Sequence, residues 1–93
     1  MLNHVVLMKF SDPEDALAAR DLLEGLKGRI GQIRELTVGL DTTGSALSYD
    51  LCLVTVHESA DDLRGYQDHP AHLEVADWIR PRLAARAVVD HES

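Results

Sequence analysis

The chain has 93 residues, and because an independent core usually needs about 50 to 200 residues, it is long enough for one domain only. We therefore expect a single domain over residues 1–93. Hydrophobic residues make up 45% and charged residues 27%, close to the average for soluble globular chains, so neither a disordered nor a fibrous class is favoured. Sixteen acidic and nine basic side chains give a net charge of −7, which repels phosphate backbones and anionic lipid. Neither nucleic acid nor a membrane is an expected partner.

The only cysteine and the apolar segments indicate the compartment. Cys52 lies between two leucines, which is typical of a buried thiol in a reducing environment. Residues 1–10 lack the basic start, apolar core and small-residue cleavage site of a signal peptide. The longest apolar stretches, such as residues 51–56, are far too short to span a bilayer. We expect a cytoplasmic location.

The first third of the chain predicts a strand followed by a helix. Residues 2–10 are rich in β-branched and large apolar side chains, which favours a strand. Ser11 or Asp12 offers a helix cap, and the fixed φ of Pro13 suits the first helical turn. Apolar residues then recur at three- and four-residue intervals as far as a helix end near Gly28. The residues expected to face inward are Ala16, Ala19, Leu22, Leu23, Leu26 and Ile30.

The rest of the chain predicts three strands and a broken helical segment. Residues 33–40 and 49–57 read as strands, the second with apolar side chains on both faces. A helix capped by Ser59 follows, and His69-Pro70 interrupts it, with His69 at the cap of the next helix. Residues 87–91 form the last short strand. The inward-facing residues expected on the second helix are Leu73, Ala76, Ile79 and Leu83.

This order, β-α-β-β-α-β, fits a ferredoxin-like α+β sandwich with a four-stranded antiparallel sheet in the order 4-1-3-2. Strands one and three are then central, and the helices cover only one face of each. Their other face carries an apolar patch that is atypical of a soluble monomer. A second copy of the same sheet is the simplest cover, so we expect a homodimer that closes a barrel between facing sheets. The patch consists of Val5, Leu7, Cys52, Val54 and Val56.

Short motifs along nearly the whole chain resemble the dimeric α/β-barrel family of stress-responsive A/B barrel domains (Dabb). The most specific motif is Tyr66-x-x-His69-Pro70-Ala71-His72. The other motifs are His4-Val-Val-Leu-Met-Lys-Phe10, Val38-Gly39, Glu58-Ser59 and Val88-Val89-Asp90. The resemblance implies a ferredoxin-like protomer and a dimer that closes a barrel, in agreement with the separate argument from the apolar patch.

The resemblance also implies roles for single residues. In related polyketide cyclases of the olivetolic acid cyclase type, a Tyr and a His of this motif promote ring closure of a poly-β-keto thioester, and they match Tyr66 and His72. A strand-one histidine of the cyclase matches His4. The chain departs from that pattern on its third strand, where Leu51 replaces a pocket histidine and His57 an aromatic residue. Its ending, Asp90-His91, replaces the usual Asp-Tyr.

The candidate site combines these residues with an apolar lining. His72 could act as a base with a pKa near neutral, and Tyr66 could donate a hydrogen bond to the oxygen of a developing enolate. The expected substrate contacts are His4, His57, Val6, Met8, Leu36 and Leu53. Each polar residue also has a structural explanation. His72 could satisfy the helix junction, the Tyr66 hydroxyl could be tied in the core, and His4 and His57 could be hydrogen-bonded core residues.

No pattern in the sequence indicates a metal or an organic cofactor. His69 and His72 lie three residues apart with a proline between them, and no carboxylate or thiolate completes a ligand set. The glycines form neither a P-loop nor a dinucleotide motif, and a nucleophile elbow is missing. We therefore expect no metal and no cofactor.

Three functions remain open at this stage. The first is a cofactor-independent enzyme, such as a cyclase or lyase, acting on a small, partly apolar carbonyl compound. The second is a module that binds such a ligand unchanged, and the third is a structural, stress-associated dimer with a filled pocket. A titrating His72 beside an open cavity favours the first, and an open cavity without perturbed titration favours the second. A cavity filled by leucine side chains favours the third, and the candidates are Leu22, Leu23, Leu26 and Leu36.

Overall fold

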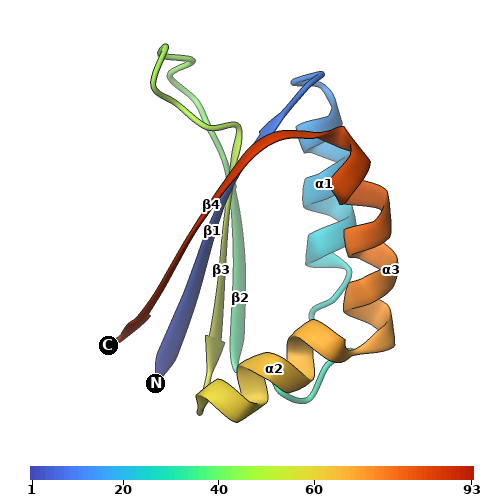
Figure 1. Cartoon of the computed structure of the whole chain (residues 1–93), viewed down its shortest axis with the longest axis vertical. Helices are drawn as coiled ribbons and strands as arrows, with labels where there is room; N and C mark the ends of the chain where they lie inside the picture. Colours follow the sequence, from blue (N-terminus) through green and yellow to red (C-terminus); the bar gives the residue numbers. More distant parts are fainter.

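A computed structural model describes all of residues 1–93 as one sheet with helices packed against one of its faces (Figure 1). Its four antiparallel strands lie in the order β2-β3-β1-β4, which is the predicted order, and the ferredoxin-like α+β prediction is confirmed. The elements are β1 (Leu2–Phe10), α1 (Asp15–Glu24), β2 (Glu35–Leu40), β3 (Leu51–His57), α2 (Ala60–Asp68), α3 (Pro70–Ile79), a short 3-10 turn η1 (Arg80–Arg82) and β4 (Leu83–Glu92).

The core fills the layer between the sheet and the helices. Alternate residues of the central strand β1, from Val6 to Phe10, point toward the helices and are almost fully buried, as the two-residue period of a strand requires. Leu53 of β3 pairs with Val6 in the β1–β3 register and shares that face. Helices α1 and α3 supply the opposing side chains, including Leu23 and Val75.

The break between α2 and α3 follows from local chemistry. The hydroxyl of Ser59 accepts a hydrogen bond from the Asp62 amide at 3.1 Å and begins α2. His69 has ψ 135°, because the following Pro70 disfavours the helical region, and α2 ends there. His69 Nδ1 accepts from the Ala71 amide at 3.0 Å, so its predicted place as the cap of the next helix is confirmed. The junction places the last turn of α2 beside the first turn of α3.

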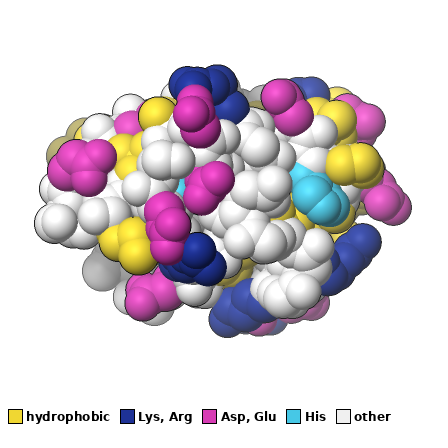
Figure 2. Space-filling view, turned by 90° about the horizontal axis from the view of Figure 1, so that it is seen from below, with side chains coloured by type: hydrophobic (Ala, Val, Ile, Leu, Met, Phe, Trp, Pro, Cys, Tyr) yellow, Lys and Arg dark blue, Asp and Glu magenta, His cyan; other side chains and the backbone are white.

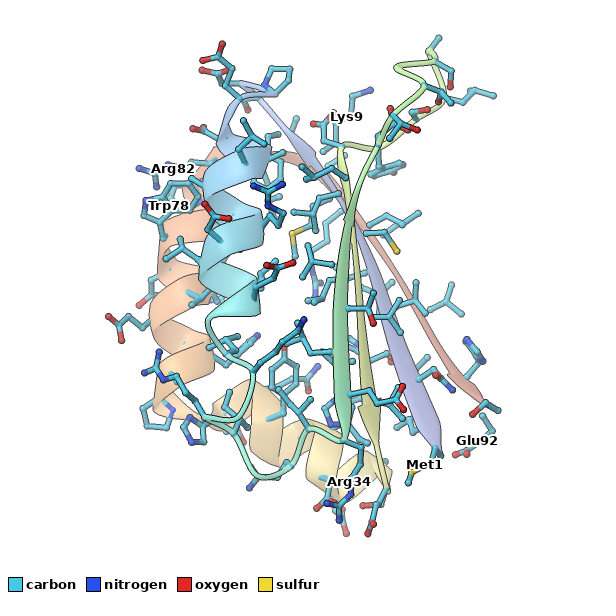
Figure 3. All side chains as sticks on the ribbon, turned by 180° about the vertical axis from the view of Figure 1, so that it is seen from behind. Met1, Lys9, Arg34, Trp78, Arg82 and Glu92 are labelled. Atoms are coloured by element: carbon cyan, nitrogen blue, oxygen red, sulfur yellow. The ribbon has the colours of Figure 1, made fainter.

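A second junction fixes the direction of β4. The Arg82 guanidinium lies 4.0 Å from the centre of the Trp78 ring and donates to the Trp78 carbonyl at 2.6 Å (Figure 3). The Ser11 amide donates to the Arg82 carbonyl at 3.0 Å. These contacts tie the end of α3 to the start of β4, which then runs antiparallel to β1 along the edge of the sheet.

Several predicted boundaries are wrong. Helix α1 ends at Glu24 rather than near Gly28, and the chain continues through turns in which Gly28 takes φ +76°, a conformation that suits glycine. Strands β2 and β3 each begin two residues later than predicted. Strand β4 begins at Leu83 instead of Ala87, because pairing with β1 outweighs the weak strand preference of its alanines and arginine.

Two predicted core positions are also wrong. Leu22 is 38% exposed and Leu73 is 40% exposed, so both face solvent. In α3 the buried stripe is Ala71, Val75 and Ile79, spaced by four residues, and Leu73 lies half a turn away from it. The predicted stripe shares only Ile79 with the observed one, because spacings of three and four residues from Ile79 fit either set of positions.

The face of the sheet opposite the helices remains uncovered by the chain (Figure 1). Val5, Leu7, Cys52, Val54 and Val56 are only partly buried there. The end of the molecule that carries α2 shows acidic side chains scattered over its surface, in keeping with the net charge of −7 (Figure 2). None of the helices is long and apolar enough to cross a membrane.

Candidate functional site

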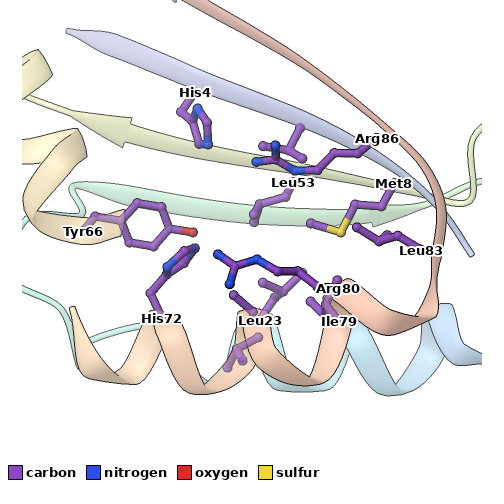
Figure 4. A pocket seen from close by; sticks show the side chains of 13 residues that line it. His4, Met8, Leu23, Leu53, Tyr66, His72, Ile79, Arg80, Leu83 and Arg86 are labelled. Atoms are coloured by element: carbon purple, nitrogen blue, oxygen red, sulfur yellow. The ribbon is translucent and has the colours of Figure 1, made fainter. Parts of the chain in front are cut away.

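A cavity of about 160 Å³ lies between the sheet and α3 (Figure 4). Its volume is close to the roughly 150 Å³ cavity that binds benzene in an engineered protein core. The apolar wall comes from β1, β3, α1 and α3, and the polar groups gather toward one end. The lining residues are His4, Val6, Met8, Leu23, Leu53, Tyr66, His72, Val75, Ala76, Ile79, Arg80, Leu83 and Arg86.

Most of the predicted site residues meet in this cavity. Those that line it are His4, Val6, Met8, Leu53, Tyr66 and His72. The two remaining residues do not line it, so their placement in the site is corrected. Leu36 packs in the core beneath β2, and His57 lies behind the Tyr66 ring. The broken helix explains the meeting of Tyr66 and His72, since their ring centres lie 4.6 Å apart across the junction.

Tyr66 stands at the centre of the polar end. The residue is 1% exposed. Its ring stacks on that of His57, with the ring centres 5.2 Å apart, and the ring of His4 meets it edge-on, with the ring centres 6.5 Å apart. The hydroxyl points into the cavity, toward the His72 ring (Figure 4). Burial raises the pKa of Tyr66 to about 12, against a smaller opposing effect of Arg86. The hydroxyl therefore stays protonated near neutral pH and can donate a hydrogen bond.

His72 is held in one tautomer. Its Nδ1 lies 2.9 Å from the Gln67 carbonyl oxygen, and since a carbonyl only accepts, Nδ1 carries the proton and Nε2 is bare. Burial lowers the pKa of His72, the bond to Gln67 acts in the other direction, and the electrostatic effects of Arg80, His4 and Arg86 lower it further. At neutral pH the ring is therefore neutral and presents a basic nitrogen beside the Tyr66 hydroxyl.

His4 is oriented by a carboxylate on the neighbouring strand. His4 and Asp90 are direct partners in the β1–β4 register, and Nδ1 of His4 lies 2.5 Å from Asp90 Oδ1. The His4 side chain is 5% exposed and that of Asp90 is 42% exposed, so the pair lies at the boundary between cavity and solvent. The ring of His4 points into the cavity (Figure 4), which gives the site a second imidazole.

His57 has no ring nitrogen free for a ligand. It is fully buried, its Nδ1 donates to the Gln32 carbonyl at 2.7 Å, and its Nε2 accepts from the Thr55 hydroxyl at 2.8 Å. Both nitrogens are thus used within the chain, and the ring supports Tyr66 by stacking. Burial is the largest influence on the pKa of His57 and lowers it.

The lowered pKa values predict how stability responds to pH. Unfolded histidines bind protons near pH 6.5, whereas folded His57 and His72 bind them only at lower pH. The unfolded chain therefore holds more protons just below pH 6.5, so the free energy of unfolding falls as the pH drops through that region. Urea unfolding at pH 7.5 and 5.5 should show a smaller loss of stability in His57→Asn than in the native chain. The exposed control His91→Asn should keep the native loss, and equal losses in all three proteins would contradict the assignment.

Two arginines and one carboxylate of the site were not predicted from the sequence. Arg80 and Arg86 line the cavity, and Asp90 holds His4. Arg86, Val88 and Asp90 lie at alternate positions of β4, with Arg86 opposite Met8 and Asp90 opposite His4. The two-residue period of a strand was therefore the signal that could have placed them on the cavity side. It was overlooked because the strand was predicted to begin at residue 87.

The described side chains offer no metal site. No three His, Cys, Asp or Glu residues lie close enough together to hold a metal ion. The imidazoles of His4 and His72 instead lie near the Tyr66 ring, and the carboxylate of Asp90 binds His4. The polar groups present suit acid–base chemistry by protein side chains.

Comparisons with known proteins place this geometry in a family. An uncharacterised protein of Streptomyces coelicolor is 29% identical over an alignment of 98 positions, gaps included, that covers 99% of each chain. A dimeric ferredoxin-like protein of unknown function from Thermobifida fusca is 28% identical, with a TM-score of 0.87 over 99% of this chain and 90% of that one. A hydroxynitrile lyase from Passiflora edulis shares the fold at 15% identity, with a TM-score of 0.81 over 97% and 90% of the two chains.

A family profile covers almost the whole sequence. The profile of the stress-responsive A/B barrel domain matches residues 2–93, which include every strand and helix and all residues that line the cavity. This match agrees with the resemblance carried by the Tyr66 to His72 motif. The chain belongs to the stress-responsive A/B barrel domain family.

Proposed function

We propose that the protein is a cofactor-independent enzyme that removes a proton from carbon beside a carbonyl group in a small, partly apolar compound. The observation that carries this proposal is the neutral His72, whose bare Nε2 lies beside the protonated Tyr66 hydroxyl at a cavity wall. A base and a hydrogen-bond donor on the same side of a cavity are the two groups that enolate formation needs. Their effect is strengthened by the apolar lining, which lowers the local dielectric.

The proposed reaction begins with transfer of the carbon-bound proton to Nε2 of His72. The electron pair of the broken C–H bond forms a C=C bond, and the carbonyl oxygen becomes an enolate oxygen that accepts a hydrogen bond from Tyr66. His72 becomes an imidazolium and keeps its bond from Nδ1 to the Gln67 carbonyl. In a cyclisation of the polyketide cyclase type, the enolate carbon then attacks a second carbonyl of the same molecule, and the new alkoxide takes the proton back from His72.

The His4–Asp90 pair gives the reaction a second polar contact. With Asp90 accepting from Nδ1, the ring of His4 is fixed in rotation and faces the ligand. We assign it to binding and orienting a second oxygen of the substrate, which is the role expected from the sequence. The carbonyl compound is thus held between His4 on the sheet and His72 on the helix, with Tyr66 between them.

The structure argues against a filled, vestigial pocket. That alternative requires leucine side chains to occupy the space, but Leu22 is 38% exposed, and neither Leu26 nor Leu36 lines the cavity. Leu23 forms part of the wall, and about 160 Å³ stays empty. The binding module without turnover is the remaining alternative, and only an assay separates it from the enzyme.

The proposed binding partners of the protein are the carbonyl ligand and a second copy of the chain. We propose a homodimer through the open face of the sheet, supported by its apolar side chains and by the dimeric protein from Thermobifida fusca. The facing sheets would close the barrel while leaving the cavity of each protomer on its own helix side.

The experiment is the uptake of solvent deuterium at C2 of 3-oxobutanamide, followed by proton NMR. The native protein should exchange these protons faster than buffer alone, and Tyr66→Phe should lower the rate by about 10²-fold or more, the usual effect of removing one oxyanion donor. Tyr49→Phe is the matched control, because Tyr49 lies outside the cavity, and its rate should equal the native rate. Exchange at the buffer rate would refute the enzyme and leave the binding module.

A further inference from the structure

We propose that the ligand of this cavity is a small organic carboxylate, whose carboxylate binds between Arg80 and Arg86 while its carbonyl faces Tyr66 and His72. The second half of this statement rests on the proposed function. The first half, the capture of the carboxylate, rests on the arginines alone and can be tested alone.

The two arginines approach the cavity from opposite sides. Arg80 follows the last turn of α3, whereas Arg86 lies on β4 opposite Met8 of β1. In Figure 4 both guanidinium groups extend toward the end of the cavity that holds His4, Tyr66 and His72. Their charges reach this end, since both contribute to the lowered pKa of His72, and Arg86 also acts on Tyr66.

Neither positive charge is neutralised well within the chain. Arg86 has no carboxylate within 4.0 Å, although the sequence has sixteen acidic and nine basic residues. The single carboxylate near Arg80 is Asp77, one turn earlier at 3.7 Å, and both side chains are more than 60% exposed, where an ion pair is weak. Asp90 shares the face of β4 with Arg86 but is bound to His4. The cavity therefore has a positive end in an otherwise acidic protein.

The size and lining of the cavity select the kind of anion. A guanidinium presents paired N–H donors in a planar fork that matches a carboxylate, so two arginines can hold one carboxylate firmly. A space of about 160 Å³ accepts a body no larger than roughly one six-membered ring. The apolar wall, with Val6, Leu53 and Ile79, suits a hydrocarbon body rather than inorganic phosphate. A short keto acid meets all three conditions.

Two probes of equal heavy-atom count test the carboxylate. 3-Oxobutanoate and 3-oxobutanamide differ only in the charge and the terminal group, and their binding can be followed by NMR titration of backbone amides. The native protein should bind the acid at least about tenfold more tightly, the scale of one charge-assisted hydrogen bond. Arg86→Leu should lower the affinity for the acid about tenfold and leave the affinity for the amide unchanged. Arg86→Lys should retain part of the affinity for the acid that Arg86→Leu loses. Added salt should weaken the binding of the acid and leave the binding of the amide unchanged.

The matched control is Arg29→Leu, which removes the same charge from an exposed arginine outside the cavity. Its affinity for the acid should stay near the native value, and melting curves should show that all variants fold. Equal affinity for both probes, or an equal loss in Arg29→Leu and Arg86→Leu, would overturn the proposal.

Deuterium exchange into the amide separates the two proposals. Binding of the acid that depends on Arg86 without any exchange would refute catalysis alone, and exchange without preference for the acid would refute the carboxylate site alone.

Discussion

Replacing His72 with alanine is expected to lower the rate of deuterium exchange by about 10²- to 10⁴-fold, the usual effect of removing a general base. The expectation follows from the bare Nε2 of His72 at the cavity wall, next to Tyr66 across the helix junction. The fold should survive, because the one hydrogen bond lost is that to the Gln67 carbonyl, which lies at the end of a helix and is accessible to water once the ring is removed. The rate is measured with 3-oxobutanamide in D2O at pH 7.

His91→Ala is the control for this experiment. His91 is exposed on the last strand, so its removal changes the histidine content without touching the cavity. The control should exchange at the native rate. If His72→Ala instead lowers the free energy of unfolding by about 1 kcal/mol or more and leaves exchange unchanged, His72 satisfies the helix junction and is no base.

Replacing Val54 with aspartate is expected to break the dimer or unfold the chain. Val54 lies on the open face of β3, opposite Val5 of β1 and Thr37 of β2. A stable protein–protein interface usually buries about 1,600 Å² in total. An unpaired carboxylate buried there would cost roughly several kcal/mol. Size-exclusion chromatography with light scattering measures the mass of both proteins at micromolar concentration.

Leu17→Asp provides the comparison for the dimer. Leu17 is 53% exposed on α1, in the helix layer on the other side of the sheet, so the same kind of substitution should leave the mass unchanged. A native chain that is folded and monomeric at micromolar concentration would contradict the dimer directly.

Local signals made most of the fold predictable. Ser59 and Pro70 set the bounds of α2 and α3 through capping and through the restriction that proline places on its neighbour. The order of the predicted elements, β-α-β-β-α-β, fitted a ferredoxin-like sheet with β3 in a central position, where it lies between β2 and β1. These features depend on neighbouring residues only, so a single sequence contains them.

The errors concern features that depend on distant contacts. Strand β4 begins at Leu83 because it pairs with β1, more than seventy residues earlier, and this pairing brings Arg86 and Asp90 to the cavity. The tautomer of His72 depends on the Gln67 carbonyl, which only the folded junction places beside the ring. His57 was expected in the cavity, yet Thr55 and Gln32 occupy its nitrogens. Residue type and spacing do not contain such information.

The role of His72 as the base is tested most directly by a ¹⁵N NMR titration of its ring. At pH 7 the proton should be on Nδ1 and Nε2 should be bare, and the titration midpoint should lie below 6.5 because burial lowers the pKa of His72. Addition of 3-oxobutanamide should move the Nε2 resonance, and His91 should not respond. A ring that is still doubly protonated at pH 7, or an Nε2 that carries the proton and does not shift when the ligand is added, would contradict the role of His72 as the base.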